Sequence, residues 1–172
     1  MNRFVSPLLR LIDRVSPPAT VSAHCDIPCG IYDPHAAQIA ALTVLRMNQL
    51  IANLQMAGTE KGQLDTYANS LGRYIRTKEE HAELCKKEID ILWHDYFRPE
   101  HLEKYPDLHT KVWMANKLAS RNKQNVDMAA AEELLAAVRE IAEIFWATKG
   151  VATRVAGSNQ TVGGELVYVD NR

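Results

Sequence analysis

LDTYANSLGRYIRTKEEHAELCKKEIDILWHDY, residues 64–96, is a long periodic segment of this 172-residue chain. Apolar and aromatic side chains recur along it at helical spacing, on one nearly continuous face. These positions, together with an aligned lysine, are Leu64, Tyr67, Leu71, Tyr74, Lys78, Cys85, Ile89, Leu92 and Tyr96. The pattern predicts one long amphipathic helix.

Three shorter helices are predicted around this segment. The first begins at Asp33-Pro34, where aspartate can cap free amides and proline fits the first helical position, and it ends by Gly58. A connection of about ten residues with two prolines precedes the third helix, which runs from about 106 to 122. The fourth runs from about 126 to 149. Four amphipathic helices with mostly short links predict an all-α fold, an antiparallel up-and-down four-helix bundle.

We divide the chain into four parts. Residues 1–23 form a removable pro-segment, 24–34 a metal-binding hook and 35–149 the bundle. Residues 150–172 form a C-terminal extension in which glycines precede an apolar stretch, 166–169. We expect this tail either to contain a short strand that pairs with another subunit or to be mobile.

Charge and composition exclude several classes of partner. The formal net charge is −1, which gives no electrostatic reason to expect binding to nucleic acid or to a membrane surface. No apolar run approaches the roughly 20 residues that a membrane-spanning helix needs. We therefore expect neither nucleic acid nor membrane as a partner.

The N-terminal segment and the number of cysteines indicate the cellular compartment of the protein. Residues 1–23 superficially resemble a secretory signal, but prolines and charged residues interrupt the apolar core that such a signal requires. Three cysteines make an odd number, which argues against a disulfide framework and is typical of metal or redox chemistry in a reducing compartment. We expect a cytoplasmic protein.

The candidate metal ligands lie in HCDIPCGIYDP, residues 24–34. His24, Cys25 and Cys29 fall within six residues. Two thiolates are soft donors, which are compatible with zinc, copper, iron–sulfur clusters and nickel. A structural zinc site favours four side-chain ligands, commonly from two separated pairs, and here there is one pair.

Cleavage just before His24 would add a further ligand. Val21-Ser22-Ala23 is a run of small residues that a peptidase could cut. The new amine of His24 and the amide nitrogen of Cys25 would then form a five-membered chelate, and the sulfurs of Cys25 and Cys29 would complete a square plane. That geometry indicates nickel(II) or copper(II). A metal carrier without turnover and a reversible Cys25–Cys29 thiol switch remain alternatives.

The hook resembles that of the nickel-dependent superoxide dismutases. Two further segments are similar to the same family: LWHDYFRP, residues 92–99, and IFW, residues 144–146, followed by Thr148-Lys149. The resemblance covers about residues 24–149 and implies a nickel cofactor and a four-helix bundle that assembles as a homohexamer. It also implies a processing peptidase that makes His24 the first residue.

The resemblance implies an activity and roles for individual residues. The activity is the antioxidant conversion of superoxide to molecular oxygen and hydrogen peroxide by a nickel ion that cycles between Ni(II) and Ni(III). The His24 amine, the Cys25 amide and the thiolates of Cys25 and Cys29 would bind the metal, with the His24 imidazole as an axial ligand in the oxidised state. Tyr32 and Tyr96 match the catalytic tyrosines that line the approach to nickel.

The chain departs from the family near the axial histidine. Well-known members orient this imidazole with a glutamate on the first helix and an arginine on the second. At the matching positions this chain has Ala40 and His81. The charged pair is therefore absent, and the groups that orient the ligand and tune the metal differ here.

Overall fold

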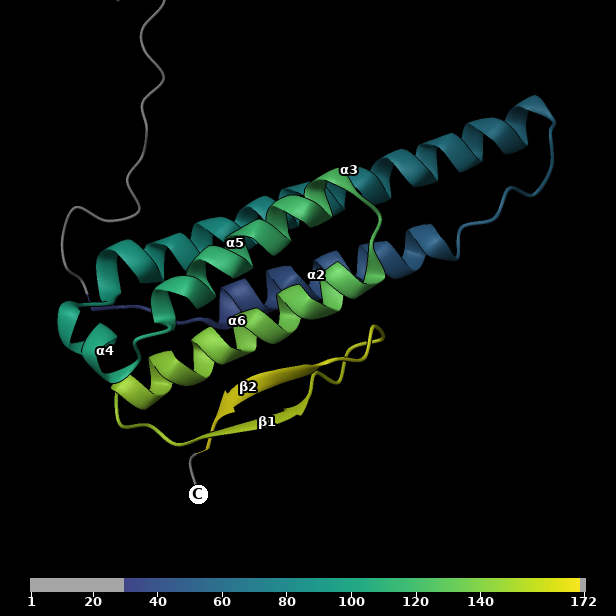
Figure 1. The fold of residues 1–172 in the computed structure, drawn as a ribbon. Helices are drawn as coiled ribbons and strands as arrows, with labels where there is room; N and C mark the ends of the chain where they lie inside the picture. The colour runs from purple at the N-terminus through teal and green to yellow at the C-terminus, as the bar shows by residue number, and fades with distance from the viewer. Residues whose placement is uncertain (1–29, 171–172) are drawn as a thin grey trace, which may run out of the picture. The chain divides into compact units, whose positions relative to one another are not determined.

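The computed structural model describes residues 30–170, and the fold is given for these residues (Figure 1). Four long helices account for most of them, and a short helix, a π-helical turn and two strands complete the chain. In sequence order these elements are α2 (His35–Ala52), α3 (Lys61–Ile91), η1 (Leu92–Tyr96), α4 (Pro99–Lys104), α5 (Leu108–Gln124), α6 (Met128–Thr148), β1 (Thr153–Gly157) and β2 (Glu165–Val169).

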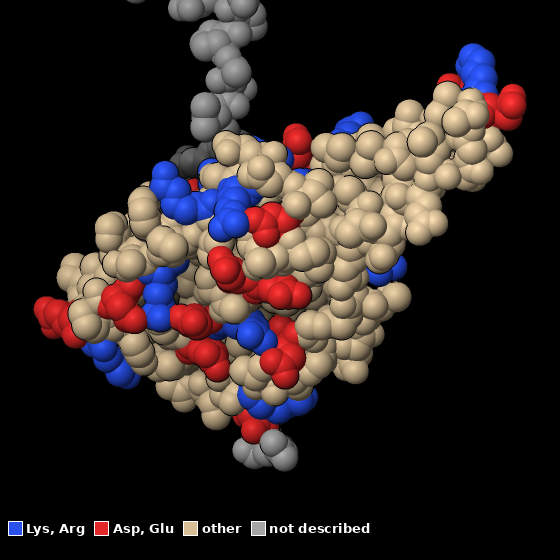
Figure 2. All heavy atoms as spheres, turned by 45° about the vertical axis from the view of Figure 1, so that its right-hand side comes forward, with Lys and Arg blue, Asp and Glu red and all other residues tan. Residues whose placement is uncertain are grey.

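The four long helices form the predicted bundle. Helix α2 packs against α3 and α6, and α5 packs against the same two helices, so the four close into one core. The prediction of an all-α bundle is confirmed. None of the helices described between residues 30 and 170 is long and apolar enough to cross a bilayer. On the face shown in Figure 2, acidic and basic side chains are interspersed.

The end of the long second helix differs from the prediction. The α-helix stops at Ile91, and the next five residues form the π-helical turn η1. The amide of Phe97 donates to the carbonyl of Leu92 at 2.9 Å, a bond that spans five residues instead of four. π turns are rare and occur frequently at functional sites. This one ends at Tyr96 and therefore sets the position of a predicted site residue.

Helix α2 begins at His35, one residue after the proline that the sequence predicts for its first position. Asp33 accepts a hydrogen bond from the amide of His35 at 2.7 Å through its carboxylate, and Pro34 between them is buried. This capping satisfies one of the amides that a helix start leaves without an intrahelical partner. The helix that follows the hook therefore has a fixed starting point.

The connection between the second and third long helices is not a plain loop. It contains α4, which begins at Pro99 in the position that suits proline best, because no amide is required there. The amide of Tyr105 donates to the carbonyl of His101 at 2.8 Å and ends this short helix. The connection brings His101 back toward the end of the bundle at which η1 lies.

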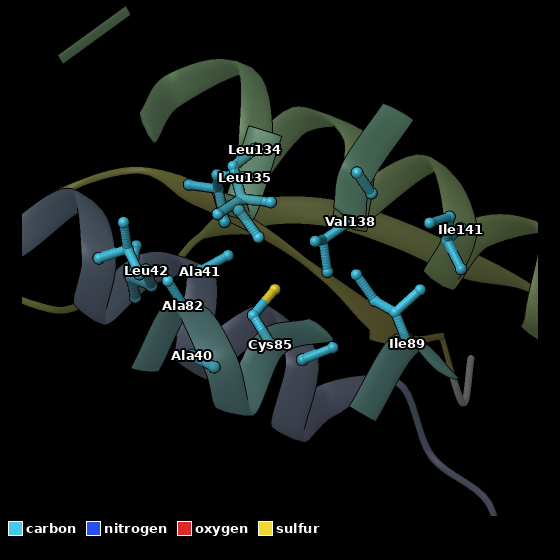
Figure 3. Packing of buried hydrophobic residues seen from close by; sticks show 14 of the residues in the cluster. Ala40, Ala41, Leu42, Ala82, Cys85, Ile89, Leu134, Leu135, Val138 and Ile141 are labelled. Carbon is cyan, nitrogen blue, oxygen red and sulfur yellow. The ribbon is translucent and has the colours of Figure 1, made fainter. Parts of the chain in front are cut away.

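The core contains the third cysteine of the chain. Cys85 has no exposed surface and lies among apolar side chains of α2, α3 and α6, including Ala41, Ile89 and Leu134 (Figure 3). Burial raises the pKa of its thiol to about 12, because a thiolate would be poorly solvated there. Cys85 is a small core residue, as its isolated place in the helical pattern indicates.

The C-terminal extension folds onto its own bundle. The strand expected near Val169 is present as β2, and it pairs antiparallel with β1 of the same chain. Leu166 is 1% exposed and belongs to the core of the bundle. The buried side chain of Gln38 in α2 accepts from the amide of Val167 at 2.7 Å and donates to its carbonyl at 3.2 Å. This hairpin therefore fixes the helix that follows the hook.

Replacing Leu166 with alanine is expected to lower the free energy of unfolding by about 2–4 kcal/mol, because the substitution leaves a cavity in a packed core. Val155→Ala in β1 is the matched control, since Val155 is 45% exposed and pairs with Val167 in the same hairpin. Its expected cost is under about 1 kcal/mol. Urea unfolding followed by circular dichroism measures both values, and equal losses would show that the hairpin is not part of the core.

Candidate metal centre

The predicted metal ligands His24, Cys25 and Cys29 lie outside the described residues. The length of the intervening chain still limits the distance between Cys29 and Tyr32. Cys29 is three residues before Tyr32, and three residues of chain span at most about 11 Å. Of the predicted site residues that the structure describes, Tyr32 is therefore the one nearest to the hook along the chain.

The donor set of the whole chain fits a soft metal at the hook. Between residues 30 and 170, no group of three or more His, Cys, Asp or Glu side chains is placed to hold a metal ion. The third thiol, Cys85, is buried and protonated, which makes it a poor ligand. Nickel(II) accepts thiolate and nitrogen donors, and the hook supplies both from His24, Cys25 and Cys29.

The structure brings the two predicted site tyrosines together. Tyr32 lies before the start of α2, and Tyr96 ends η1. Their ring centroids are 5.6 Å apart and their planes are tilted by 54°. Both side chains are half-buried. A pair of adjacent phenols thus stands beside the segment that joins the hook to the bundle.

Tyr96 is held on several sides. Its ring centroid lies 4.5 Å from that of Phe145 in α6, and it stacks on His101 of α4 at 5.5 Å with an interplanar angle of 17°. Its hydroxyl oxygen lies 2.7 Å from the hydroxyl oxygen of Thr148. The π turn, α4 and the end of α6 therefore fix both the ring and the direction of its hydroxyl.

A positive charge stands next to this tyrosine. The ammonium of Lys149 lies 5.5 Å from the ring centroid of Tyr96 and 4.7 Å from that of Phe145, distances typical of cation–π contacts. Lys149 is exposed, so its charge acts on the solvent beside Tyr96. A small anion that approaches this surface meets an attractive potential.

The sequence predicts Thr148 on the inward face of the fourth helix but gives no chemical role to Thr148 or Lys149. Both belong to the segment 144–149 that resembles the family, and that similarity was the only signal of their importance. Their proximity to Tyr96 depends on how the end of α6 packs against η1. No pattern within either segment encodes that contact.

The two positions that depart from the family have clear places in the fold. Ala40 is 1% exposed and packs in the core side of α2. His81 is half-buried in α3, and its Nδ1 lies 2.9 Å from the carbonyl of Thr77 one turn earlier. Because a carbonyl only accepts, Nδ1 is the donor in this contact. His81 is thus oriented by its own helix.

Comparisons with known proteins agree with the resemblance of the hook. Residues 19–149 match the family model described as nickel-containing superoxide dismutase. The chain is 41% identical over 134 residues to "Superoxide dismutase [Ni]" of Streptomyces coelicolor and 40% identical to that of Streptomyces seoulensis, which covers 78% of this chain and 94% of each relative. A crystal structure of a Ni-containing superoxide dismutase with oxidised-state ligation matches with a TM-score of 0.63 and 39% identity, over 74% of this chain and 99% of that one.

Proposed function

Because this chain belongs to the nickel-containing superoxide dismutases, we propose that it converts superoxide to molecular oxygen and hydrogen peroxide at a nickel ion held by His24, Cys25 and Cys29. The single observation that carries this proposal is the family match, which includes the hook and runs to the end of the bundle. The chain is thus an oxidoreductase with a nickel cofactor. The carrier alternative and the thiol switch are not favoured.

The ligand assignment follows from the donors that the chain offers. His24 contributes its terminal amine and imidazole, Cys25 its amide nitrogen and thiolate, and Cys29 its thiolate. When bound, nickel supplies a one-electron couple, Ni(II)/Ni(III), which takes an electron from one superoxide and gives it to another. Thiolate and amide donors favour the higher oxidation state. The rest of the chain acts on the substrate, on water and on protons.

Tyr32 and Tyr96 have a positioning role in this proposal. Adjacent phenols with centroids 5.6 Å apart offer hydroxyl oxygens to water and small oxygen species. Lys149 raises the local concentration of the anionic substrate. The two protons that complete hydrogen peroxide come from water that these groups order.

Three further properties are part of the proposal. A peptidase removes residues 1–23 and so creates the terminal amine of His24. The mature chains assemble as a homohexamer, and the enzyme works in the cytoplasm. An odd number of cysteines and the interrupted apolar core of residues 1–23 support the compartment.

Purified chain that begins at His24 and is loaded with nickel is the material for the test. Pulse radiolysis measures superoxide decay, and an oxygen electrode with a peroxide assay measures the products. We expect many turnovers per nickel, with one oxygen and one peroxide formed for every two superoxide ions. A carrier would retain nickel and consume no more superoxide than the metal it holds, and that outcome would refute the proposal.

Lys149→Gln is expected to lower the superoxide rate about two- to threefold at low ionic strength, because a positive charge beside the approach is lost. The difference should vanish in high salt, where an exposed charge is screened. Lys117→Gln is the matched control, since its ammonium lies 5.5 Å from the Trp113 ring, on α5. An equal loss in both variants would show that the effect reflects overall charge.

A further inference from the structure

The hydroxyl of Thr148 makes two hydrogen bonds, and together they show which group donates in the bond between Thr148 and Tyr96. Its oxygen lies 2.6 Å from the carbonyl oxygen of Phe145 and 2.7 Å from the hydroxyl oxygen of Tyr96. A threonine hydroxyl has one proton, and a carbonyl can only accept. The proton of Thr148 therefore goes to Phe145, so the proton on its other bond must come from Tyr96.

The end of α6 explains why Thr148 donates to that carbonyl. In a continuing α-helix the amide of Lys149 would reach the carbonyl of Phe145. Here that amide bonds to the carbonyl of Trp146 at 3.1 Å. The last carbonyls of a helix need other donors, and a threonine hydroxyl one turn later supplies one. The donor role of Thr148 is thus fixed by the helix end and not by the site.

We propose that Thr148 is a positioning residue whose hydroxyl oxygen accepts the hydrogen bond donated by the phenol of Tyr96. With its proton engaged in this bond, Tyr96 faces the substrate approach as a hydrogen-bond acceptor only. The inference rests on the proposed function, which places Tyr96 on that approach. A phenol in this state offers lone pairs to water and to hydrogen peroxide, both of which donate protons. It offers no donor to a small anion and does not help to retain one.

The packing of Tyr96 keeps this arrangement in place. The ring lies against Phe145 and stacks on His101, so the hydroxyl cannot swing away from Thr148 without breaking both contacts. Thr148 is itself half-buried at the end of α6. Tyr96 thereby donates no hydrogen bond to an anion that Lys149 attracts, and it can accept one from neutral peroxide.

The test compares Thr148→Val, which keeps the shape and removes the acceptor, with Thr148→Ser, which keeps the hydroxyl. Raman spectroscopy of nickel-free protein reports on Tyr96, because the ratio of the tyrosine Fermi-doublet bands distinguishes a donating phenol from an accepting one. Tyr96→Phe identifies its contribution among the six tyrosines. We expect the donor signature in wild type and Thr148→Ser, and its loss in Thr148→Val.

Azide inhibition of the processed, nickel-loaded enzyme is the second measurement. The freed phenolic proton of Thr148→Val can donate to the anion, so the inhibition constant is expected to fall roughly tenfold. Thr148→Ser should match wild type. Tyr96→Phe should also stay within about twofold of wild type, because its lost hydroxyl gave the anion no proton. This variant serves as the test should Thr148→Val not fold.

Three results would overturn the inference: an unchanged Raman signature in folded Thr148→Val, unchanged azide inhibition in that variant, or much weaker azide inhibition in Tyr96→Phe. Failure of the proposed function is a separate outcome. It would appear as processed, nickel-loaded wild type that does not consume superoxide catalytically. The Raman comparison needs neither nickel nor activity, so it decides the hydrogen-bond assignment in either case.

Discussion

Replacing either Cys25 or Cys29 with serine is expected to abolish nickel binding and superoxide dismutation together. A serine hydroxyl stays protonated at neutral pH, and it is a hard oxygen donor where the metal needs a soft thiolate. Altering a group that merely orients a metal ligand costs about 10–100-fold in affinity or activity, so losing a ligand should cost at least about 100-fold. Nickel per chain by mass spectrometry and superoxide decay by pulse radiolysis measure the two losses.

Cys85→Ala is the matched control for these substitutions. It removes the remaining thiol of the chain from a fully buried position in α3, where the sulfur contributes only packing. We expect full nickel content and activity, with a loss of about 1 kcal/mol in unfolding free energy. If Cys85→Ala lost nickel as Cys25→Ser does, the assignment of ligands to the hook would be wrong.

A chain that retains residues 1–23 is expected to lose at least about 100-fold in activity relative to the chain that begins at His24. In the precursor the nitrogen of His24 is part of a peptide bond, so it is no longer a basic amine that can bind the metal. The same assay on both forms, after identical nickel loading, measures the difference. Intact mass spectrometry confirms the first residue of each.

A chain that begins at Ala23 separates the amine from the bulk of the pro-segment. It carries one extra residue, but its free amine is displaced from His24. If the position of the amine is what matters, this chain should be as inactive as the precursor. Activity equal to that of the His24 form would contradict the chelate and would leave steric obstruction as the role of residues 1–23.

Helix periodicity predicted the bundle because the relevant contacts repeat locally. The spacing in 64–96 marks a face of α3 that is buried only from Lys78 onward, whereas Leu64 near its start is 41% exposed. Asp33-Pro34 marks the start of α2. The π turn at Leu92–Tyr96 has no such signal, because the same residues would also continue an α-helix. Its existence depends on how the end of α3 meets the rest of the bundle.

The hairpin of β1 and β2 could also be predicted only in part from the sequence. Strand β2 is visible in the sequence as an apolar run after a pair of glycines, but β1 alternates weakly and has no marked pattern. The contacts that stabilise the hairpin come from residues distant in the sequence. Gln38 of α2 bonds to the backbone of Val167, and Leu166 packs in the core of the bundle. A strand stabilised by a helix side chain cannot be inferred from strand propensity alone.

Some residues of the candidate site could be predicted from the sequence, and others could not. The metal donors lie within six residues, so the sequence alone indicates soft-metal chemistry at His24, Cys25 and Cys29. Tyr32 and Tyr96 came from family resemblance, and the structure brings them together. The hydroxyl of Thr148 beside Tyr96 required the packing of two helix ends, which no spacing rule encodes.

The hydrogen bonds between Gln38 and Val167 also affect when the fold can form during translation. The two residues are 129 positions apart, so at usual elongation speeds the ribosome needs roughly 6–26 s after making the first before it adds the second. During that time the nascent α2 lacks the hairpin that covers it. The contact between α2 and the hairpin therefore forms only near the end of translation.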